Sequence, residues 1–172
     1  LVSLGVDAGT ESLFVSSGTL APPSEFVALA AAGLAAHYVP LYVFLSSPDV
    51  PQARSVTFVQ SVAAVRDVGM PAYATVQAGL SGLMVSLLSQ VGGSAVRVNT
   101  VMYSSMVSSE TQSEVSHRDP SLFYADQVAS PLGRLANPTD VADAVFFVSQ
   151  GSSLINGQTV VVDSGQLRMW KS

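Results

Sequence analysis

Two hydroxyl side chains, those of Ser61 and Tyr73, lie twelve residues apart in the first half of the chain. A serine and a tyrosine that meet can hold a substrate oxygen and pass a proton to it, provided that the tyrosine pKa approaches the working pH. A nearby cation lowers the pKa of a phenol by about 1–3 units, and a residue four positions after Tyr73 could supply it. That residue is Gln77, which forms hydrogen bonds but carries no charge.

The other candidates for chemistry or metal binding are few. His37 and His117 have no carboxylate and no second histidine at ligand spacing, so the sequence predicts no metal site. Arg66 lies in the loop before Tyr73, and nothing in its spacing places it beside the phenol. Asp163 is followed by a Ser-Gly pair and is expected to form a turn rather than to act as a catalytic carboxylate.

The composition of the 172 residues indicates a single domain, 1–172, with an apolar surface. Apolar residues make up 48% and charged residues 11%, which favours burial of part of the surface against other chains. The net charge of −5 argues against nucleic acid and anionic membranes as partners. No uninterrupted apolar run reaches the roughly 18–20 residues of a transmembrane segment. The closest, 26–45, contains His37 and Pro40 and is expected to be a buried helix with an irregular middle.

Short β-branched stretches alternate with long helical patterns. Nearly continuous apolar strands between helices indicate an α/β fold with a doubly wound, mostly parallel sheet that is covered on both faces. Strands are predicted at 1–6, 12–17, 55–61, 95–102 and 158–164. Helices are predicted at 24–46, 72–90 and 139–149, with a shorter one around 110–128. Thr139 or Asp140 is expected to cap the helix at 139–149.

The helix predicted at 72–90 has two distinct faces. An apolar stripe that should face the sheet is formed by Val76, Leu80, Leu83, Met84 and Leu87. A second stripe of mostly small side chains is formed by Ala74, Ala78, Ser81, Val85 and Ser89. Small side chains let another helix approach closely, so this stripe could pack against a helix of another subunit or lie beneath a loop.

From about residue 12 to its end, the chain resembles the short-chain dehydrogenase/reductase family. The segments similar to the family's strands four, five and six are LFVSSGTLAPP (13–23), SVTFVQSVAAV (55–65) and VRVNTV (96–101). YATVQ (73–77) falls where the family has Tyr-x-x-x-Lys, and PLGRLANPTDVADAVFFVSQGSSLINGQTVVVDSG (131–165) is similar to its C-terminal helix, loop and last strand. The resemblance implies a Rossmann-like sheet that lacks the family's first strands.

The resemblance also implies roles for individual residues. In this family a tyrosine transfers a proton while a hydride passes between a nicotinamide cofactor and a carbonyl carbon. A serine holds the substrate oxygen, a lysine lowers the tyrosine pKa and anchors the ribose, and an asparagine supports a proton-relay water. Ser61 and Tyr73 match the serine and the tyrosine, whereas Gln77 takes the lysine position and Ala30 the asparagine position. The resemblance thus implies that the pair is vestigial.

The part of the pattern that binds the cofactor is altered as well. The family's glycine-rich turn, which holds the pyrophosphate, has no counterpart in the sequence, and 6–12 (VDAGTES) is not expected to act as a phosphate loop. The Asn-Asn-Ala-Gly motif after strand four becomes Ser16, Ser17 and Gly18, one residue short. The Pro-Gly pair after strand six is replaced by Tyr103 and the serine that follows it. No NAD(P) site is therefore predicted within this chain.

Loss confined to the site, with the scaffold retained, favours a non-catalytic structural or accessory subunit without a cofactor. Its partner would be a second copy or a related subunit, because the family pairs helices equivalent to 24–46 and 72–90 into a four-helix bundle. The alternative is an NAD(P)-dependent oxidoreductase of the carbonyl or 3-oxoacyl reductase type, with its cofactor loop upstream of Leu1.

Two further expectations concern the cofactor cleft and the sheet edge. A ligand-binding module that uses the vacated cleft would have an apolar pocket beside Ser61 and Tyr73. The apolar strand predicted at 12–17 would need a covering neighbour, since a bare strand edge invites pairing or aggregation.

Overall fold

The computed structural model describes residues 2–4, 22–47, 55–66, 70–93, 96–106, 124, 127–151 and 154–168. The main elements in this part of the chain are β1 (Val2–Leu4), α1 (Pro23–Ser46), β2 (Ser55–Ser61), α2 (Pro71–Val91), β3 (Arg97–Tyr103), α5 (Pro138–Phe146) and β4 (Thr159–Val162). Short helical turns lie at η3 (Val62–Ala64), η4 (Phe147–Gly151) and η5 (Gln166–Arg168).

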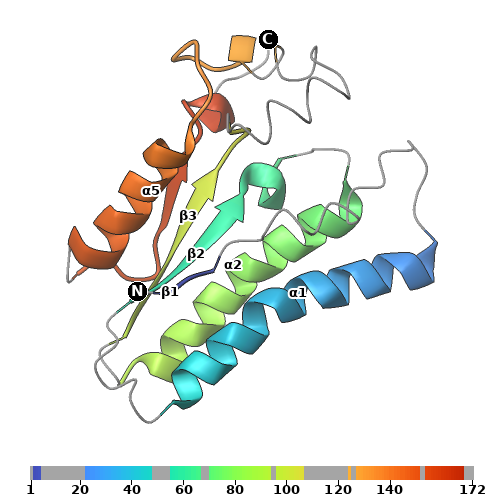
Figure 1. Ribbon diagram of the computed structural model, residues 1–172, viewed down its shortest axis with the longest axis vertical. Helices are drawn as coiled ribbons and strands as arrows, with labels where there is room; N and C mark the ends of the chain where they lie inside the picture. Colours follow the sequence, from blue (N-terminus) through green and yellow to red (C-terminus); the bar gives the residue numbers. More distant parts are fainter. Residues whose placement is uncertain are drawn as a thin grey trace.

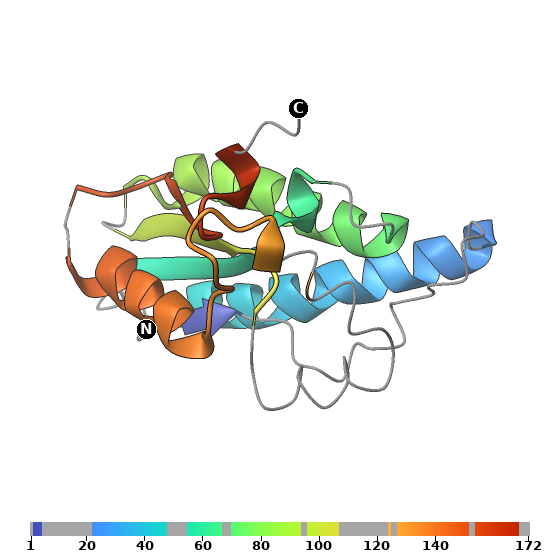
Figure 2. The same cartoon turned by 90° about the horizontal axis from the view of Figure 1, so that it is seen from above.

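The strands form one parallel sheet in the order β1-β2-β3-β4. Helices α1 and α2 lie on one side of the sheet and α5 lies on the other, as Figures 1 and 2 show. Because both faces are covered, β2 and β3 are buried along nearly their whole length rather than at alternate residues. The predicted α/β class, with a mostly parallel Rossmann-like sheet, is confirmed.

The strand predicted at 1–6 is present as β1, but its place in the sheet differs from the prediction. β1 runs parallel to β2, with Val2 opposite Val56 and Leu4 opposite Phe58. The resemblance had placed 12–17 at the strand-four position beside 55–61, but β1 takes that place, so the assignment of 13–23 to strand four is wrong. Residues 12–17 lie outside the described residues, so the structure does not test whether that strand is covered.

The core consists of two apolar clusters, one on each face of the sheet. The cluster beneath the helix pair contains Leu41, Val56, Phe58, Leu80, Met84, Leu87, Val91, Val96 and Val98. The cluster beneath α5 contains Val101, Ala136, Val141, Val145 and Val148. The apolar stripe predicted for α2 faces the first cluster, although Leu83 is only half-buried. In the stripe of small residues, Ala78, Val85 and Ser89 are exposed.

α1 is a continuous, largely exposed helix rather than a buried helix with an irregular middle. It runs through Pro40, and its buried residues are Gly33, His37 and Leu41. A Cβ atom on Gly33 would lie 2.7 Å from Val76 Cγ2, so the glycine allows α2 to approach closely. The expectation was wrong because apolar composition alone does not bury a helix; only one side of α1 is buried among the described residues.

Helices α1 and α2 are long and apolar enough to cross a membrane by length and composition. Their mean hydropathies are 1.7 and 1.2, and 17% and 33% of the respective windows are buried inside the structure. Core helices of soluble proteins pass the same test, so this is weak evidence for membrane insertion.

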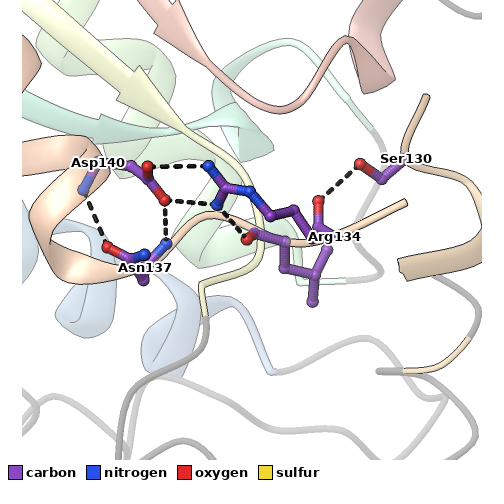
Figure 3. Close-up of polar contacts among 5 residues, drawn as sticks. Ser130, Arg134, Asn137 and Asp140 are labelled. Atoms are coloured by element: carbon purple, nitrogen blue, oxygen red, sulfur yellow. Dashed lines mark hydrogen bonds and ion pairs between the residues drawn. The ribbon is translucent and has the colours of Figure 1, made fainter. Parts of the chain in front are cut away.

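The start of α5 lies earlier than predicted, and its cap is Asn137 rather than Thr139 or Asp140. Asn137 Oδ1 accepts a hydrogen bond from the Asp140 N–H at 3.0 Å, and Asp140 Oδ2 accepts one from the Asn137 N–H at 2.9 Å (Figure 3). This reciprocal capping box leaves Asp140 at the third helical position. Of the helix predicted around 110–128, the described residues are Tyr124 and 127–128, which are helical.

Candidate functional site

The carboxyl ends of β2 and β3 bring Ser61 and Tyr103 together. The two residues are partners in the parallel register, and doubly wound sheets bind their ligands at this edge. Tyr73 lies in the first turn of α2, which begins after the η3 turn that follows Ser61. The sequence predicted Ser61 and Tyr73 as site residues, whereas Tyr103 was noted only because it replaces part of the family's Pro-Gly pair. The position of Tyr103 at the end of the strand that follows β2 could have identified it.

Three hydroxyl groups form a hydrogen-bonded cluster at this edge. The Tyr73 hydroxyl is hydrogen-bonded to the side chains of Ser61 and Tyr103. Ser61 Oγ also accepts a hydrogen bond from the Ala63 N–H at 3.1 Å and so caps η3. That bond uses a lone pair of Ser61 Oγ and leaves the Ser61 proton for the hydrogen bond to Tyr73. The cluster can therefore hold an oxygen atom and exchange a proton with it.

The cluster contains no charge that would favour ionisation of its phenols. Burial raises the pKa of Tyr73, and the hydrogen bonds from Ser61 and Tyr103 offset this only in part. Burial also raises the pKa of Tyr103, and the neighbouring Tyr73 raises it further. Arg66 Nη1 donates a hydrogen bond to Gln166 Oε1 at 3.3 Å. Both tyrosines are therefore neutral phenols at neutral pH.

Gln77, at the lysine position of the family, is turned inward. It is 1% exposed, and its Oε1 accepts a hydrogen bond from the Ser61 N–H at 2.8 Å. Gln60 Nε2 donates to the main-chain oxygen of Gln77 and, at 2.8 Å, to Ser81 Oγ. The amide thus joins α2 to the end of β2. The described residues fit a substrate oxygen beside Tyr73, but Gln77 does not fit as the anchor for a cofactor ribose.

The remaining residues of the family's pattern lie apart from the cluster or outside the described residues. Ala30 is a half-buried residue of α1 whose methyl side chain cannot support a water molecule. Ser16, Ser17 and Gly18 lie outside the described residues. Since β1 occupies the strand-four place, the motif that follows that strand corresponds to 6–9, Val-Asp-Ala-Gly, which ends in the Ala-Gly of the family motif.

Metal ligands and pockets add little to the cluster. Within the described ranges, no three His, Cys, Asp or Glu residues are grouped to hold a metal ion. His37 Nδ1 is 2.8 Å from the Gly33 oxygen, whereas His117 lies outside the described residues. A cleft of about 410 Å³ is lined by segments 131–136 and 161–165 and includes neither hydroxyl of the predicted pair.

Asp163 closes the turn after β4. Its carboxylate accepts hydrogen bonds from the Gly165 N–H at 2.8 Å and from the Leu167 N–H at 2.7 Å. Ser164 and Gly165 adopt positive φ angles of 55° and 88°. The prediction that Asp163 forms a turn is confirmed.

Comparison with known proteins places this arrangement in a family. The family model described as Enoyl-(Acyl carrier protein) reductase matches residues 46–166. A (3R)-3-hydroxyacyl-CoA dehydrogenase of Canis lupus familiaris is 35% identical over 107 residues, which are 60% of this chain and 39% of the relative. A 3-oxoacyl-[acyl-carrier-protein] reductase of Chlamydia trachomatis is 34% identical over 98 residues, 56% of this chain and 38% of the relative.

Solved structures agree with the family model. An oxidoreductase of the short-chain dehydrogenase/reductase family from Burkholderia thailandensis superposes with a TM-score of 0.76 at 30% identity, over 87% of this chain and 59% of that one. The chain spans about two fifths of the length of the curated relatives it matches. Since the family model covers well over half of the sequence, the chain belongs to the short-chain dehydrogenase/reductase family.

Proposed function

We propose that the protein is an NAD(P)-dependent short-chain oxidoreductase that interconverts a carbonyl compound and the corresponding secondary alcohol. The observation that carries this proposal is the hydrogen-bonded pair of Ser61 and Tyr73 at the carboxyl edge of the sheet. A structural subunit would not need these two hydroxyls to meet where doubly wound sheets bind ligands.

The chain's own residues account for the proton side of such a reaction. Ser61 Oγ donates a hydrogen bond to the carbonyl oxygen and fixes it beside Tyr73. In the direction of reduction, Tyr73 gives its hydroxyl proton to that oxygen, and the carbonyl becomes an alcohol. The reverse reaction returns the proton to the phenolate. NAD(P), when bound, supplies or accepts the hydride at the carbonyl carbon.

The relatives support both the reaction and a substrate class. Two of them are named for 3-hydroxyacyl and 3-oxoacyl thioesters, which makes a 3-oxoacyl compound the first substrate to examine. The position of β1 also weakens the case for a lost cofactor site, because the sequence that follows it, Val-Asp-Ala-Gly at 6–9, ends in Ala-Gly. Fewer features of the family's pattern are then missing than the sequence alone indicated.

The proposal is tested by following NADPH and NADH oxidation by the purified protein with short 3-oxoacyl thioesters. We expect Tyr73→Phe to lower turnover by about 10²–10⁴-fold, the contribution of a general acid. Tyr124→Phe is the matched control, because Tyr124 is 69% exposed and lies outside the cluster. Thermal shift with each nucleotide adds an independent measurement, since binding to the folded state raises the melting temperature. Absence of both turnover and nucleotide-induced stabilisation would overturn the proposal.

A second candidate function, a non-catalytic accessory subunit, is favoured by the outer face of α1. This face carries exposed apolar side chains, namely Val27, Tyr38, Val39, Tyr42 and Val43. Tyr38 and Tyr42 stack with their ring centroids 6.4 Å apart. Apolar surface of this kind is typical of subunit interfaces, and the uncharged Gln77 supports the absence of catalysis. A second copy of this chain or a related subunit would cover α1 and α2.

Size-exclusion chromatography with light scattering tests this interface. We expect the protein to associate at micromolar concentration and Tyr42→Glu to dissociate it, because a charge would be buried between subunits. Leu154→Glu is the control, since Leu154 is an apolar residue that is 91% exposed outside the helix pair. A monomeric wild-type protein would contradict the subunit role. Association without nucleotide binding would favour it over the oxidoreductase.

A further inference from the structure

We infer that Gln77 is a positioning residue for the proposed reaction: its side-chain oxygen holds the main chain of Ser61 at the end of β2. This inference rests on the proposed function, in which Ser61 binds the substrate oxygen. It gives the residue at the family's lysine position a role as a hydrogen-bond acceptor rather than as a charge. Gln77 then supports the site instead of marking its loss.

Two neighbouring residues at the end of β2 bind the same part of α2. The Ser61 N–H donates to Gln77 Oε1 at 2.8 Å. Gln60 Nε2 donates to the main-chain oxygen of Gln77 and, at 2.8 Å, to Ser81 Oγ, about one turn further along the helix. Gln60 is fully buried and Gln77 is 1% exposed, so water competes little for these hydrogen bonds. Three polar contacts therefore join this part of α2 to the strand end.

The chemistry of the partners determines which way both side-chain amides face. A main-chain N–H can only donate, so Gln77 must present its oxygen to Ser61. A main-chain carbonyl can only accept, so Gln60 must present its nitrogen to Gln77. A lysine ammonium has donors only and could not accept the Ser61 N–H. The glutamine therefore makes a contact at this position that the family's lysine could not make.

The helix that carries Gln77 is held independently of the Gln77 side chain. Gln60 binds the main-chain oxygen of Gln77 and the Ser81 hydroxyl, and neither contact needs the side-chain amide at residue 77. Movement of α2 along β2 would leave the buried Gln60 nitrogen without these acceptors, which is costly. Gln60 thus fixes the helix turn, and from that fixed turn the Gln77 side chain reaches Ser61.

The contact with Gln77 determines where the Ser61 hydroxyl lies. Ser61 is the last residue of β2, and the chain turns into η3 directly after it. Its N–H is held by Gln77, and its Oγ accepts a hydrogen bond from the Ala63 N–H at 3.1 Å. The first bond fixes the main chain, and the second restricts the side-chain rotamer. Loss of the Gln77 oxygen should therefore displace Ser61 Oγ from the substrate oxygen.

The hydrogen bond itself can be measured in the unmodified full chain. NMR detects scalar coupling across a hydrogen bond, here from the Ser61 amide nitrogen to the side-chain carbonyl carbon of Gln77. We expect this coupling together with those of the β2–β3 pairing. Its absence from a spectrum that shows the couplings of the sheet would overturn the inference. Because no variant is needed, this result does not depend on whether a variant folds.

Hydrogen exchange measures what the acceptor contributes. Gln77→Met keeps a side chain of similar length without the amide, and we expect exchange at the Ser61 N–H to accelerate about tenfold more than at Val59, the equivalent of one hydrogen bond. Gln77→Glu should keep the protection, because either form of a carboxyl group accepts a hydrogen bond. Gln90→Met, the same substitution at an exposed position of α2, is the matched control. Equal acceleration at Ser61 and Val59 would overturn the inference.

Turnover of a 3-oxoacyl thioester tests whether Gln77 acts through Ser61. We expect Gln77→Met to lower kcat by about 10–100-fold, since a small displacement of a catalytic group has effects of this size. In a Ser61→Ala background the same substitution should lower kcat by less than about threefold, because the hydroxyl that it positions is already absent. Equal factors in the two backgrounds would overturn the inference. A protected Ser61 N–H in a protein without turnover would support the hydrogen bond and refute the proposed function instead.

Discussion

The helix pair α1/α2 and helix α5 cover opposite faces of the same sheet by different means. α2 meets β2 and β3 mainly through apolar side chains, and α1 meets α2 where Gly33 admits Val76 and Gly79 admits Leu34. On the other face, polar side chains of β3 bind the main chain at the end of α5. Arg97 donates to the oxygens of Val148, Ser149 and Ile155 at 2.7–2.9 Å.

The difference shows how the helices are held on each face of the sheet within the described residues. The α5 face satisfies its helix end and the following loop, because Asn99 also binds the Ile155 oxygen and the Gln158 N–H. The α1/α2 face buries one side of α1 and leaves Tyr42 and Val43 exposed. Exposed apolar side chains also lie at the end of α5, at Phe146 and Phe147, so the two faces differ in how their helices are held and not in exposure. We expect the stability of the helix-pair face to depend on apolar packing and that of the α5 face to depend on polar contacts.

The largest effect is expected for Leu80→Ala beneath the helix pair. Leu80 is fully buried in the cluster between α2 and the sheet. Removal of its side chain leaves a cavity, so the free energy of unfolding should fall by about 3–4 kcal/mol in urea denaturation. Ser86→Ala, an exposed position of the same helix, should change it by less than about 0.5 kcal/mol. Similar values for the two variants would show that this face is not held by its apolar cluster.

A smaller loss is expected for Arg97→Met on the opposite face. The variant keeps an unbranched apolar chain but removes three hydrogen bonds to main-chain oxygens near the end of α5. Unsatisfied buried carbonyl groups should lower the free energy of unfolding by about 2–3 kcal/mol. Hydrogen exchange should accelerate in α5 before it does so in α2. Arg168→Met is the control, because Arg168 is exposed. Equal stability of the two variants would show that the hydrogen bonds of Arg97 do not stabilise this face.

Most of the fold could be predicted from the sequence because its long elements have strong patterns. The apolar stretch at 55–61 became β2 with the same bounds, and 72–90 became α2 with one residue added at each end. The strand at 1–6 was predicted too, but the place beside β2 was assigned to 12–17, because strand patterns do not show which strands pair. The cap of α5 was misplaced by two or three residues because Asn137, Thr139 and Asp140 are all good capping residues.

The candidate site was predictable only in part. Ser61 and Tyr73 could be found from residue types and spacing along the chain. The place of Tyr103 beside Ser61 depends on the register between β2 and β3, which brings these two residues, 42 positions apart, to the same edge. The inward orientation of Gln77 likewise depends on the Ser61 N–H at the end of β2. Sequence spacing shows neither of these contacts.

A glycine pair provides a sharper measurement on the helix face. Gly33→Ala places a methyl group within 2.7 Å of Val76 Cγ2, and the resulting overlap should lower the free energy of unfolding by about 1–2 kcal/mol. Gly82→Ala in α2 meets no atom within 4 Å and should raise it by about 0.5–1 kcal/mol, because alanine favours the helix. A lower free energy of unfolding for Gly33→Ala and a higher one for Gly82→Ala would show that α1 and α2 are in close contact at Gly33. Stabilisation by both would contradict it.

The smallest effect is expected for the exposed ion pair at the start of α5. Arg134 Nη1 lies 2.7 Å from Asp140 Oδ2 (Figure 3), and this hydrogen bond, with that from the Asn137 N–H, lowers the pKa of Asp140 from 3.8 to about 2. A carboxyl whose pKa is lower in the folded state stabilises the fold above its unfolded pKa. That contribution is lost as the pH falls from 3.8 toward about 2.

Arg134→Gln should therefore bring the Asp140 pKa closer to 3.8, so that less of the stability of the fold depends on pH in this window. The change should be small at physiological salt, since the pair is exposed and screened. Urea denaturation at several pH values measures it, with Arg168→Gln as the control. An identical pH dependence in Arg134→Gln and the wild type would mean that the capping hydrogen bond from Asn137 alone holds the carboxylate. Polar contacts at the start of α5 would then act through the main chain, as those of Arg97 do at its end.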